Sequence, residues 1–324
     1  MAFEDGLGVD PTQPQTGDFT LSATGLVSQT LNLWTRKYVQ YVILVGLVSV
    51  VTTLMSFIVV FTIFGSIGLL ASDPISYLFS TFILTTAPDW TYVVVTVTFG
   101  IVVFLINAVL SGATIKYALD DYSGLAAEIG TSFSYSFGKT AKIVLVQLIM
   151  ALIVAAVTAP SLAMMTRALE GIDISDPFNP VIDPEAIQYM MMGAGLMLFG
   201  GIFMLYIIVR FAPAIAIIVD TELSAIDSLK KAWELTSGNF WHVFGAQILI
   251  GFVVALLGMV VSLGTTFLMD PDPIFNPNPY AYVVQILLTS LLFSAPSLVY
   301  VAVLYRDLVS RKGVSVSDLP EYVL

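Results

Sequence analysis

The segment RFAPAIAIIVDTELSAIDSLKKAWELTSGNFWHVFGAQILI, residues 210–250, decides the fold of this chain. The segment begins at the end of one hydrophobic run and contains Pro213. A proline ring kinks or breaks the interior of a helix. Ser224 and Asp227 are then spaced as in a capping box, and Gly238 suits the left-handed position that ends a helix. Four apolar residues between Pro213 and Gly238 recur on one helical face: Leu223, Ile226, Leu229 and Trp233. The segment therefore predicts an amphipathic helix along a membrane surface, followed by a turn into the next hydrophobic run.

The composition indicates lipid as the main solvent. Of 324 residues, 57% are hydrophobic and only 11% are charged, whereas soluble domains carry roughly 25% charged residues. The absence of cysteine and the single histidine, His242, exclude disulfides, thiolate sites and multi-histidine zinc centres. The net charge of -11 excludes nucleic acid as a partner. Together with the missing cysteine, this acidic balance is compatible with an archaeal source.

Six apolar stretches are each long enough to cross about 30 Å of hydrocarbon, which takes about 20 helical residues. In lipid the backbone must satisfy its own hydrogen bonds, so helices are expected rather than open strands. The fold class is therefore an all-α integral membrane protein with six transmembrane helices. The expected spans are residues 38–69, 91–118, 140–165, 186–211, 240–268 and 280–305.

The basic residues predict the orientation of these spans. All of the 12 lysines and arginines except Arg167 fall on or near one side of the predicted helices. By the positive-inside rule that side is cytoplasmic, so both termini are expected there, in a plasma-membrane protein. Two acidic loops on the opposite side, residues 173–185 and 270–280, lack the spacing of a calcium-binding EF-hand and are interpreted as solvated loops.

The plan of residues 210–250 recurs twice in weaker form. Residues 138–147 align without a gap with residues 238–247, and Gly138 is expected to end a surface helix as Gly238 does. Residues 25–37 form a third copy. Three parallel units are therefore predicted, each an interfacial amphipathic helix followed by a transmembrane hairpin. They cover residues 21–119, 120–219 and 220–312, after a disordered cytoplasmic leader (1–20) and before a cytoplasmic tail (313–324).

These motifs resemble those of a broad prokaryotic membrane-domain family that includes the membrane domain found beside glycerophosphoryl diester phosphodiesterases. Pro213, Asp220 and residues 225–241, AIDSLKKAWELTSGNFW, are similar to its central pattern, except that Ala232-Trp233 stands where the family has Ser-Trp. Residues 31–38, LNLWTRKY, and 304–308, LYRDL, resemble its opening and closing elements. The resemblance implies a polytopic membrane fold. No phosphodiesterase domain follows within these residues, so we expect no hydrolase activity to carry over.

The cytoplasmic cations predict contact with lipid headgroups, because anionic headgroups attract such residues by about 1 kcal/mol each. Arg210 is the sharpest candidate, since arginine within a hydrophobic span is expensive. We expect it to be an anchor that reaches the interface, with a salt bridge or an anionic-headgroup site as alternatives. The predicted headgroup contacts are Arg36, Lys37, Lys139, Lys142, Arg210, Lys230, Lys231 and His242, which we call the basic collar.

Amide side chains inside the spans are the remaining polar candidates. Asn107, Gln147 and Gln247, together with Arg210, either join helices through hydrogen bonds or line a polar cavity between the units. Intramembrane amides commonly form interhelical bonds, so we favour the first role. Gln147 and Gln247 occupy matching places in their two spans.

No residue set in the sequence forms a reaction centre, so we expect no catalytic, cofactor-binding or metal site. The predicted role is non-enzymatic: membrane organisation, or binding of lipid or of a partner protein, through the basic collar. The alternative is a transporter or permease for a small or amphipathic substrate, with the cavity between the units. Membrane lipids are the expected partners, and a membrane-protein partner and a homo-oligomer are both left open.

Overall fold

The computed structural model describes residues 20–55, 90–173, 181–269 and 279–313. Apart from turns and one antiparallel pair of two-residue strands, β1 (Ile172–Asp173) and β2 (Val181–Ile182), these residues are helical. Six of the described segments are long and apolar enough to cross a membrane, which confirms an all-α, multi-pass membrane protein. Residues 1–19, 56–69 and 314–324, and most of both acidic loops, carry predictions that lie outside the described residues.

Within the described residues, two of the spans are broken, and each break lies beside a proline. Pro213 separates α7 from α8, and Pro296 begins α12 after a short break behind α11. Proline lacks the N–H that an uninterrupted helix would use. In chain order the spans contain α2 (Tyr38–Tyr41) with a π-helical turn, η1 (Val42–Gly46); α5 (Trp90–Tyr122); α6 (Ile129–Glu170); α7 (Pro184–Phe211) with α8 (Ala214–Asp220); α10 (Phe240–Met269); and α11 (Pro279–Phe293) with α12 (Pro296–Arg311).

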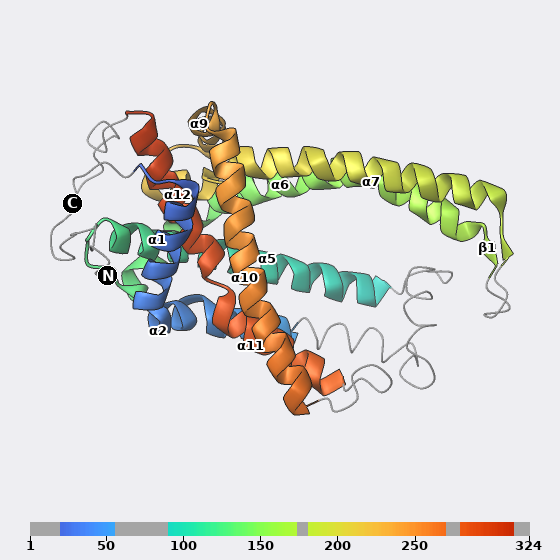
Figure 1. The fold of residues 1–324 in the computed structure, drawn as a ribbon, viewed down its shortest axis with the longest axis horizontal. Coiled ribbons are helices and arrows are strands. Elements are labelled where there is room, and N and C mark those ends of the chain that lie inside the picture. Colours follow the sequence, from blue (N-terminus) through green and yellow to red (C-terminus); the bar gives the residue numbers. More distant parts are fainter. Residues whose placement is uncertain (1–19, 56–89, 174–180, 270–278, 314–324) are drawn as a thin grey trace, which may run out of the picture.

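Two amphipathic helices lie crosswise to the long α6–α7 hairpin, at one end of the molecule (Figure 1). They are α1 (Ala23–Arg36) and α9 (Ala225–Thr236). As predicted, Ser224 caps α9 by accepting a hydrogen bond from Asp227 N at 3.2 Å, and Gly238, with φ +83°, separates α9 from α10. We call this end, formed by α1, α8, α9 and the adjoining ends of α5, α6, α10 and α12, the polar end.

Gly138 does not end a helix, so this prediction was wrong. Helix α6 continues through it, and the expected surface helix of the middle unit is the first part of α6. Contacts on both sides of the glycine fasten the helix to its neighbours: Ser136 Oγ donates to Val109 O at 2.7 Å, and Lys139 Nζ donates to Thr221 O at 2.7 Å. Tertiary contacts have therefore overridden a local signal for a helix end.

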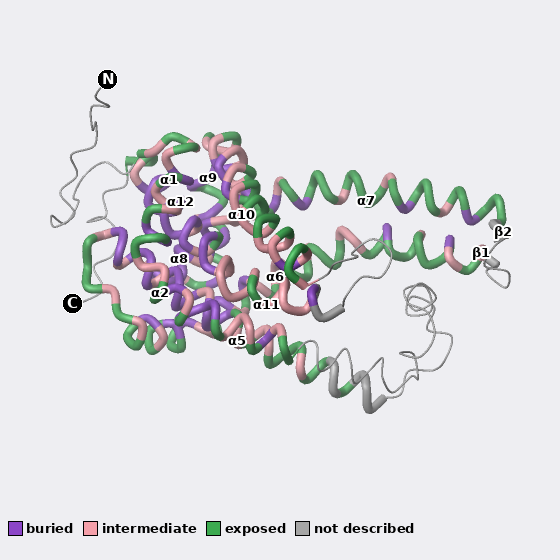
Figure 2. The backbone as a smooth tube through the Cα atoms, turned by 60° about the horizontal axis from the view of Figure 1, so that its bottom comes forward, coloured by how far each residue is buried: buried purple, intermediate pink, exposed green. Residues whose placement is uncertain are grey.

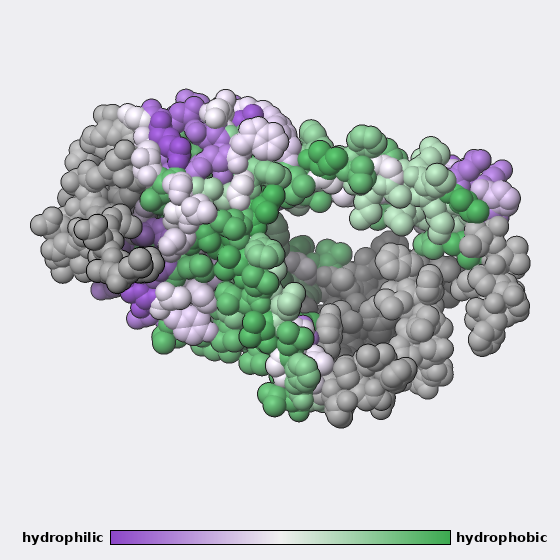
Figure 3. All heavy atoms as spheres, viewed as in Figure 1, coloured by the Kyte–Doolittle hydropathy of each residue, from purple (hydrophilic) through white to green (hydrophobic). Residues whose placement is uncertain are grey.

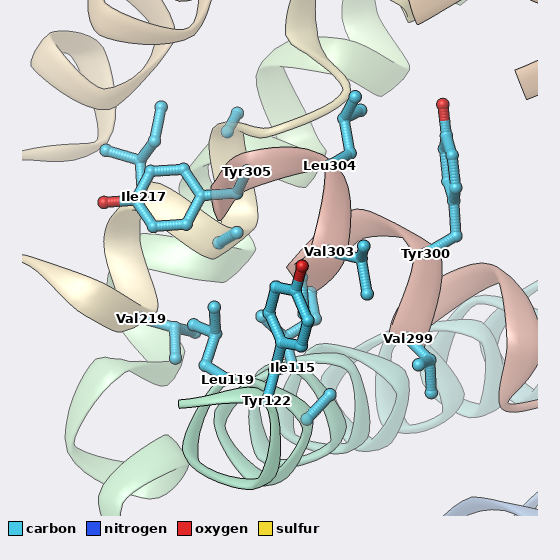
Figure 4. Packing of buried hydrophobic residues seen from close by; sticks show 14 of the residues in the cluster. Ile115, Leu119, Tyr122, Ile217, Val219, Val299, Tyr300, Val303, Leu304 and Tyr305 are labelled. Atoms are coloured by element: carbon cyan, nitrogen blue, oxygen red, sulfur yellow. The ribbon is translucent and has the colours of Figure 1, made fainter. Parts of the chain in front are cut away.

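Helix α12 is the centre of the polar end. Its residues from Val299 to Val309 are buried, except for Val301, which is intermediate. Figure 4 shows α12 side chains among those of α5, such as Ile115 and Leu119, and of α8, such as Ile217. A helix that is apolar around its circumference belongs inside a bundle, and this position explains why the charged residues within α12 are buried as well.

The α6–α7 hairpin extends far beyond this core (Figure 1). Figure 2 shows that its distant part is largely exposed, and large apolar side chains such as Met191 and Phe199 are 71% and 72% exposed. In Figure 3, hydrophilic residues gather at the polar end and at the far tip of the hairpin, with hydrophobic surface between them. Exposed apolar surface of this kind is typical of a protein that hydrocarbon surrounds.

Candidate functional site

Most of the basic collar is held in ion pairs at the polar end. Arg36 and Lys37, at the end of α1, both contact Asp121 at the end of α5, at 2.9 and 2.7 Å. Only 5% of the Asp121 side chain is exposed. The two cations therefore offset a carboxylate that would be strongly destabilising without them, and they fasten α1 to α5.

A second cluster fastens α6 to the loop between α8 and α9. Lys139 Nζ lies 2.5 Å from Glu222 Oε1, and Lys142 Nζ lies 3.3 Å from Glu222 Oε2. Lys139 is itself buried. The hydrogen bond that Lys139 donates is the largest cause that lowers the pKa of Glu222 below its ordinary value, and the bond from Lys142 acts in the same direction.

Asp307 is the most completely buried charge of the polar end, and it joins three elements. Its carboxylate accepts hydrogen bonds from Leu21 N at 2.7 Å and from Arg311 Nε at 2.9 and 3.0 Å. His242 Nε2, on α10, lies 2.9 Å from the same carboxylate. His242, which the sequence placed at the lipid headgroups, thus contacts an internal acid in the structure.

Asp220, at the end of α8, binds the centre of α12. Tyr305 donates to Asp220 Oδ2 at 2.8 Å, and Arg306 Nη2 lies 3.3 Å from Asp220 Oδ1. The sequence analysis did not single out Asp121, Asp220 or Asp307 as partners. Each follows or ends an apolar span, and this position was the one available signal, because their partners lie far away along the chain.

Lys230 and Lys231 differ from the other paired lysines and arginines of the basic collar, because their partners lie on their own helix. They contact Asp227 and Glu234 at 3.3 and 3.1 Å, and the Lys230 side chain is 74% exposed. Exposed pairs of this kind contribute little stability. These two lysines can therefore exchange their partners for lipid headgroups at little cost.

Arg210 has aromatic rings around it instead of an acid. Its guanidinium carbon lies 5.1 Å from the ring centre of Tyr206, 4.8 Å from that of Trp233 and 5.7 Å from that of Phe240. The nitrogens Nε and Nη1 are buried and have no hydrogen-bond partner. Within the described residues, no carboxylate forms an ion pair with it, so the salt-bridge alternative is not supported.

A cavity of about 690 Å³ lies where the spans meet below the polar end. It contains three of the four polar residues predicted for such a cavity: Asn107 of α5, Gln147 of α6 and Gln247 of α10. Among the described residues that line it, none is charged. The complete lining is Phe104, Asn107, Val146, Gln147, Met150, Ile208, Phe211, Ala212, Ala214, Ile215, Gln247, Ile250, Gly251, Ser297, Tyr300 and Val301.

Arg210 does not line this cavity, contrary to the prediction. The lining residues Ile208 and Ala212 are each two positions away from it, which is about 200° of helix rotation at 3.6 residues per turn. The Arg210 side chain therefore leaves α7 on a different side, toward the rings of α9 and α10. The cavity and Arg210 are separate sites.

The two glutamines have buried side-chain oxygens without partners. Oε1 of Gln147 and Oε1 of Gln247 are removed from solvent and accept no hydrogen bond. Asn107, in contrast, donates from Nδ2 to Val103 O at 3.0 Å on its own helix. Within the described residues, then, neither glutamine oxygen joins two helices, which was the role we had favoured. An unsatisfied buried acceptor costs about 1–3 kcal/mol.

The break in the fourth span forms part of the cavity wall. Phe211, Ala212, Ala214 and Ile215 line it on both sides of Pro213. Interrupted helices within the membrane are tolerated where the irregular backbone is buried in protein or lines a cavity. Tyr300, which the sequence analysis missed, completes the wall from α12 and donates to Val243 O at 3.3 Å. Its apolar surroundings in the sequence gave no signal for this role.

Within the described residues, no group of three or more histidine or acidic side chains is arranged to hold a metal ion. The polar side chains that line the cavity carry amide and hydroxyl groups. Such groups can orient a bound molecule through hydrogen bonds, and the apolar walls can hold its hydrocarbon part.

A family described as a domain of unknown function, DUF7847, matches residues 133–308. The match covers more than half of the 324 residues, so the chain belongs to this family. It includes every described residue of the cavity wall except Phe104 and Asn107. No curated protein and no solved structure matches the chain. The resemblance to the membrane domains that accompany phosphodiesterases stays a prediction.

Proposed function

We propose that this protein is a non-enzymatic membrane protein that binds a small amphipathic molecule in the cavity between its spans. The observation that carries the proposal is that Gln147 and Gln247 line the same cavity and that each has a buried side-chain oxygen without a partner. A bound molecule with a hydroxyl or N–H group would satisfy them. The cavity volume of about 690 Å³ is within the range of pockets that hold drug-sized ligands, about 300–1,000 Å³.

The ligand class follows from the lining. Apolar side chains such as Met150, Phe211 and Ile250 suit a hydrocarbon portion, and the absence of charge among the described lining residues disfavours an ionic head. A neutral amphiphile with a hydrogen-bond donor fits best, because burying a charge without a partner is far more costly than burying a hydroxyl that has an acceptor.

Transport is the extension of this proposal. The cavity wall draws on all three predicted units: α5 from the first, α6 to α8 from the second, and α10 and α12 from the third. Movement of one unit against the others would open such a cavity to alternate sides, as in transporters that bind their substrates at broken helices between repeats. The broken fourth span supports this extension.

Membrane organisation through the basic collar ranks second. Seven of its eight residues contact an acid of the same chain, which leaves Arg210 and the weakly paired Lys230 and Lys231 for headgroups. We place the polar end in the cytoplasm of a plasma-membrane protein. Because the chain has no cysteine, single-cysteine variants test this directly: Lys230→Cys should react with an impermeant reagent from the inside, and Glu185→Cys from the outside.

The binding proposal is tested with a long-chain alcohol that carries a photoreactive diazirine, added to the purified protein in nanodiscs. We expect labelling of the cavity wall, and about tenfold weaker binding to the Gln147→Leu/Gln247→Leu double variant, since two hydrogen bonds are lost. Gln285→Leu is the matched control, because it removes an amide from α11 outside the cavity lining. Equal labelling of all three proteins would refute the proposal. Flux of the same alcohol derivative across liposomes separates transport from binding.

A further inference from the structure

Arg210 stands apart from the other cations of the polar end. Nine of the 12 lysines and arginines form an ion pair with a carboxylate. Arg167, at the far tip, lies over the ring of Tyr189, and Lys312 donates to Ser237 O. Arg210 retains a charge for which the described residues supply no acceptor.

From this we infer that Arg210, held by Tyr206, Trp233 and Phe240, is a binding site for the phosphate of an anionic lipid headgroup. Buried charges in proteins are normally paired, and a guanidinium offers a planar fork of donors that matches phosphate oxygens. Two of its nitrogens, Nε and Nη1, are both buried and unbonded. A phosphate beside this guanidinium would supply the anion that the described residues lack.

The three rings orient this fork. Their centres lie 4.8 to 5.7 Å from the guanidinium carbon, which is the range of cation–π contacts. Such contacts restrict the plane of the guanidinium but leave its positive charge in place. In addition, Thr236 Oγ1 donates to the Arg210 carbonyl at 3.2 Å, which ties α9 to the end of α7. The cation is thus preorganised, so little conformational entropy is lost when an anion binds.

The position of Arg210 favours a lipid over a free phosphate ion. It lies at the end of α7, beside the crosswise helix α9 and the first residue of α10. Trp233 and Trp241 nearby are 39% and 77% exposed, and tryptophan at the membrane–water boundary is typical of the headgroup level. The adjoining N-terminal turn of α10 also favours negative charge. A lipid would place its phosphate at Arg210 and its chains against the exposed apolar surface.

The test measures lipid-dependent stability and lipid retention. The protein is purified in detergent and transferred to nanodiscs of phosphatidylcholine alone or with phosphatidylglycerol. Native mass spectrometry of retained lipid and the thermal unfolding midpoint are then compared for the wild type, Arg210→Gln and Lys230→Gln. Lys230→Gln is the matched control, because it removes the same charge from an exposed, weakly paired site.

We expect Arg210→Gln to lose the preference for phosphatidylglycerol by about fivefold or more, while Lys230→Gln keeps it nearly intact. Should Arg210→Gln fail to fold, Arg210→Lys retains the charge without the planar fork and should show an intermediate preference. Equal retention in wild type and Arg210→Gln would overturn the proposal, as would stabilisation of the lipid-free protein by inorganic phosphate that equals the lipid effect. These readouts are independent of the cavity, because Arg210 does not line it.

Discussion

The polar end and the cavity below it draw on the same helices, but most charged side chains of the polar end are paired, whereas two amide side chains of the cavity wall have oxygens without partners. On α6, Lys142 contacts Glu222, whereas Gln147, less than two turns further along, has a buried oxygen with no partner. On α10 the same change occurs between His242, which contacts Asp307, and Gln247. We interpret the polar end as a region that stabilises the fold and the cavity as the proposed ligand site.

The largest effect should come from the best-partnered group of the polar end. Replacing Asp307 by Asn removes the charge that faces Arg311 and His242, and it leaves buried donors without an anion. Loss of one partner from a buried ionic group is strongly destabilising, about 3–5 kcal/mol. Chemical unfolding in detergent should show this loss for Asp307→Asn and a far smaller one for Asp227→Asn, whose pair with Lys230 is exposed. Similar losses for both would break the comparison.

The two aligned glycines sharpen the comparison, because Gly138 lies inside α6 whereas Gly238 lies between α9 and α10. Gly238→Ala should destabilise the protein by about 1–2 kcal/mol, since alanine is strained at a φ of +83°. Gly138→Ala should instead stabilise it by about 0.5–1 kcal/mol, because Gly138 is inside a helix with open space around it. Thermal unfolding of the two single variants measures these changes in stability. Lower stability in both variants would contradict a continuous α6.

Replacing the cavity amides should not destabilise the protein, in contrast to replacing the ionic groups of the polar end. Gln147→Leu and Gln247→Leu each remove a buried acceptor that has no partner, so the stability of the ligand-free protein should remain within about 1 kcal/mol or increase. Ligand-free unfolding measurements check this. A clear loss of stability would show that the glutamines serve the fold, and the proposed function would then lose its basis.

The smallest effect is the pH dependence of the cluster around Glu222. Its pKa is lowered, first by the hydrogen bond from Lys139. The pairing is therefore fully present above the ordinary glutamate value of 4.5 and is lost as the pH falls through the lowered value. The difference in thermal midpoint between wild type and Glu222→Gln should shrink over that acidic window. A difference that stays constant with pH would rule out the pairing as its cause. The magnitude should be below about 1 kcal/mol, because the Glu222 side chain is 42% exposed.

Local signals in the sequence predicted local structure well. Ser224 and Gly238 correctly placed both ends of α9, and hydropathy located the spans, because both depend on neighbouring residues. The prediction that Gly138 ends a helix was wrong, because contacts of its neighbours with α5 and with the loop before α9 determine the structure there. The burial of α12 could not be predicted either, since an apolar helix gives no sign of whether lipid or protein surrounds it.

In the candidate site, too, local features could be predicted from the sequence and long-range contacts could not. Gln147, Gln247 and Asn107 line one cavity, which was the less favoured alternative to the interhelical hydrogen bonds expected from the sequence. The exclusion of Arg210 follows from the rotation of α7, which directs Ile208 and Ala212, but not Arg210, toward the cavity. The acids that occupy the collar, Asp121 and Asp307 among them, required long-range pairing that periodicity does not encode.

The most direct test of the central claim is a high-resolution cryo-electron microscopy map of the protein extracted with its own membrane lipids into nanodiscs. The account predicts density for an elongated molecule in the cavity, with a polar atom at hydrogen-bond distance from the side-chain oxygens of Gln147 and Gln247. A cavity without such density, in which these two amides bond to each other or to the surrounding helices, would contradict it.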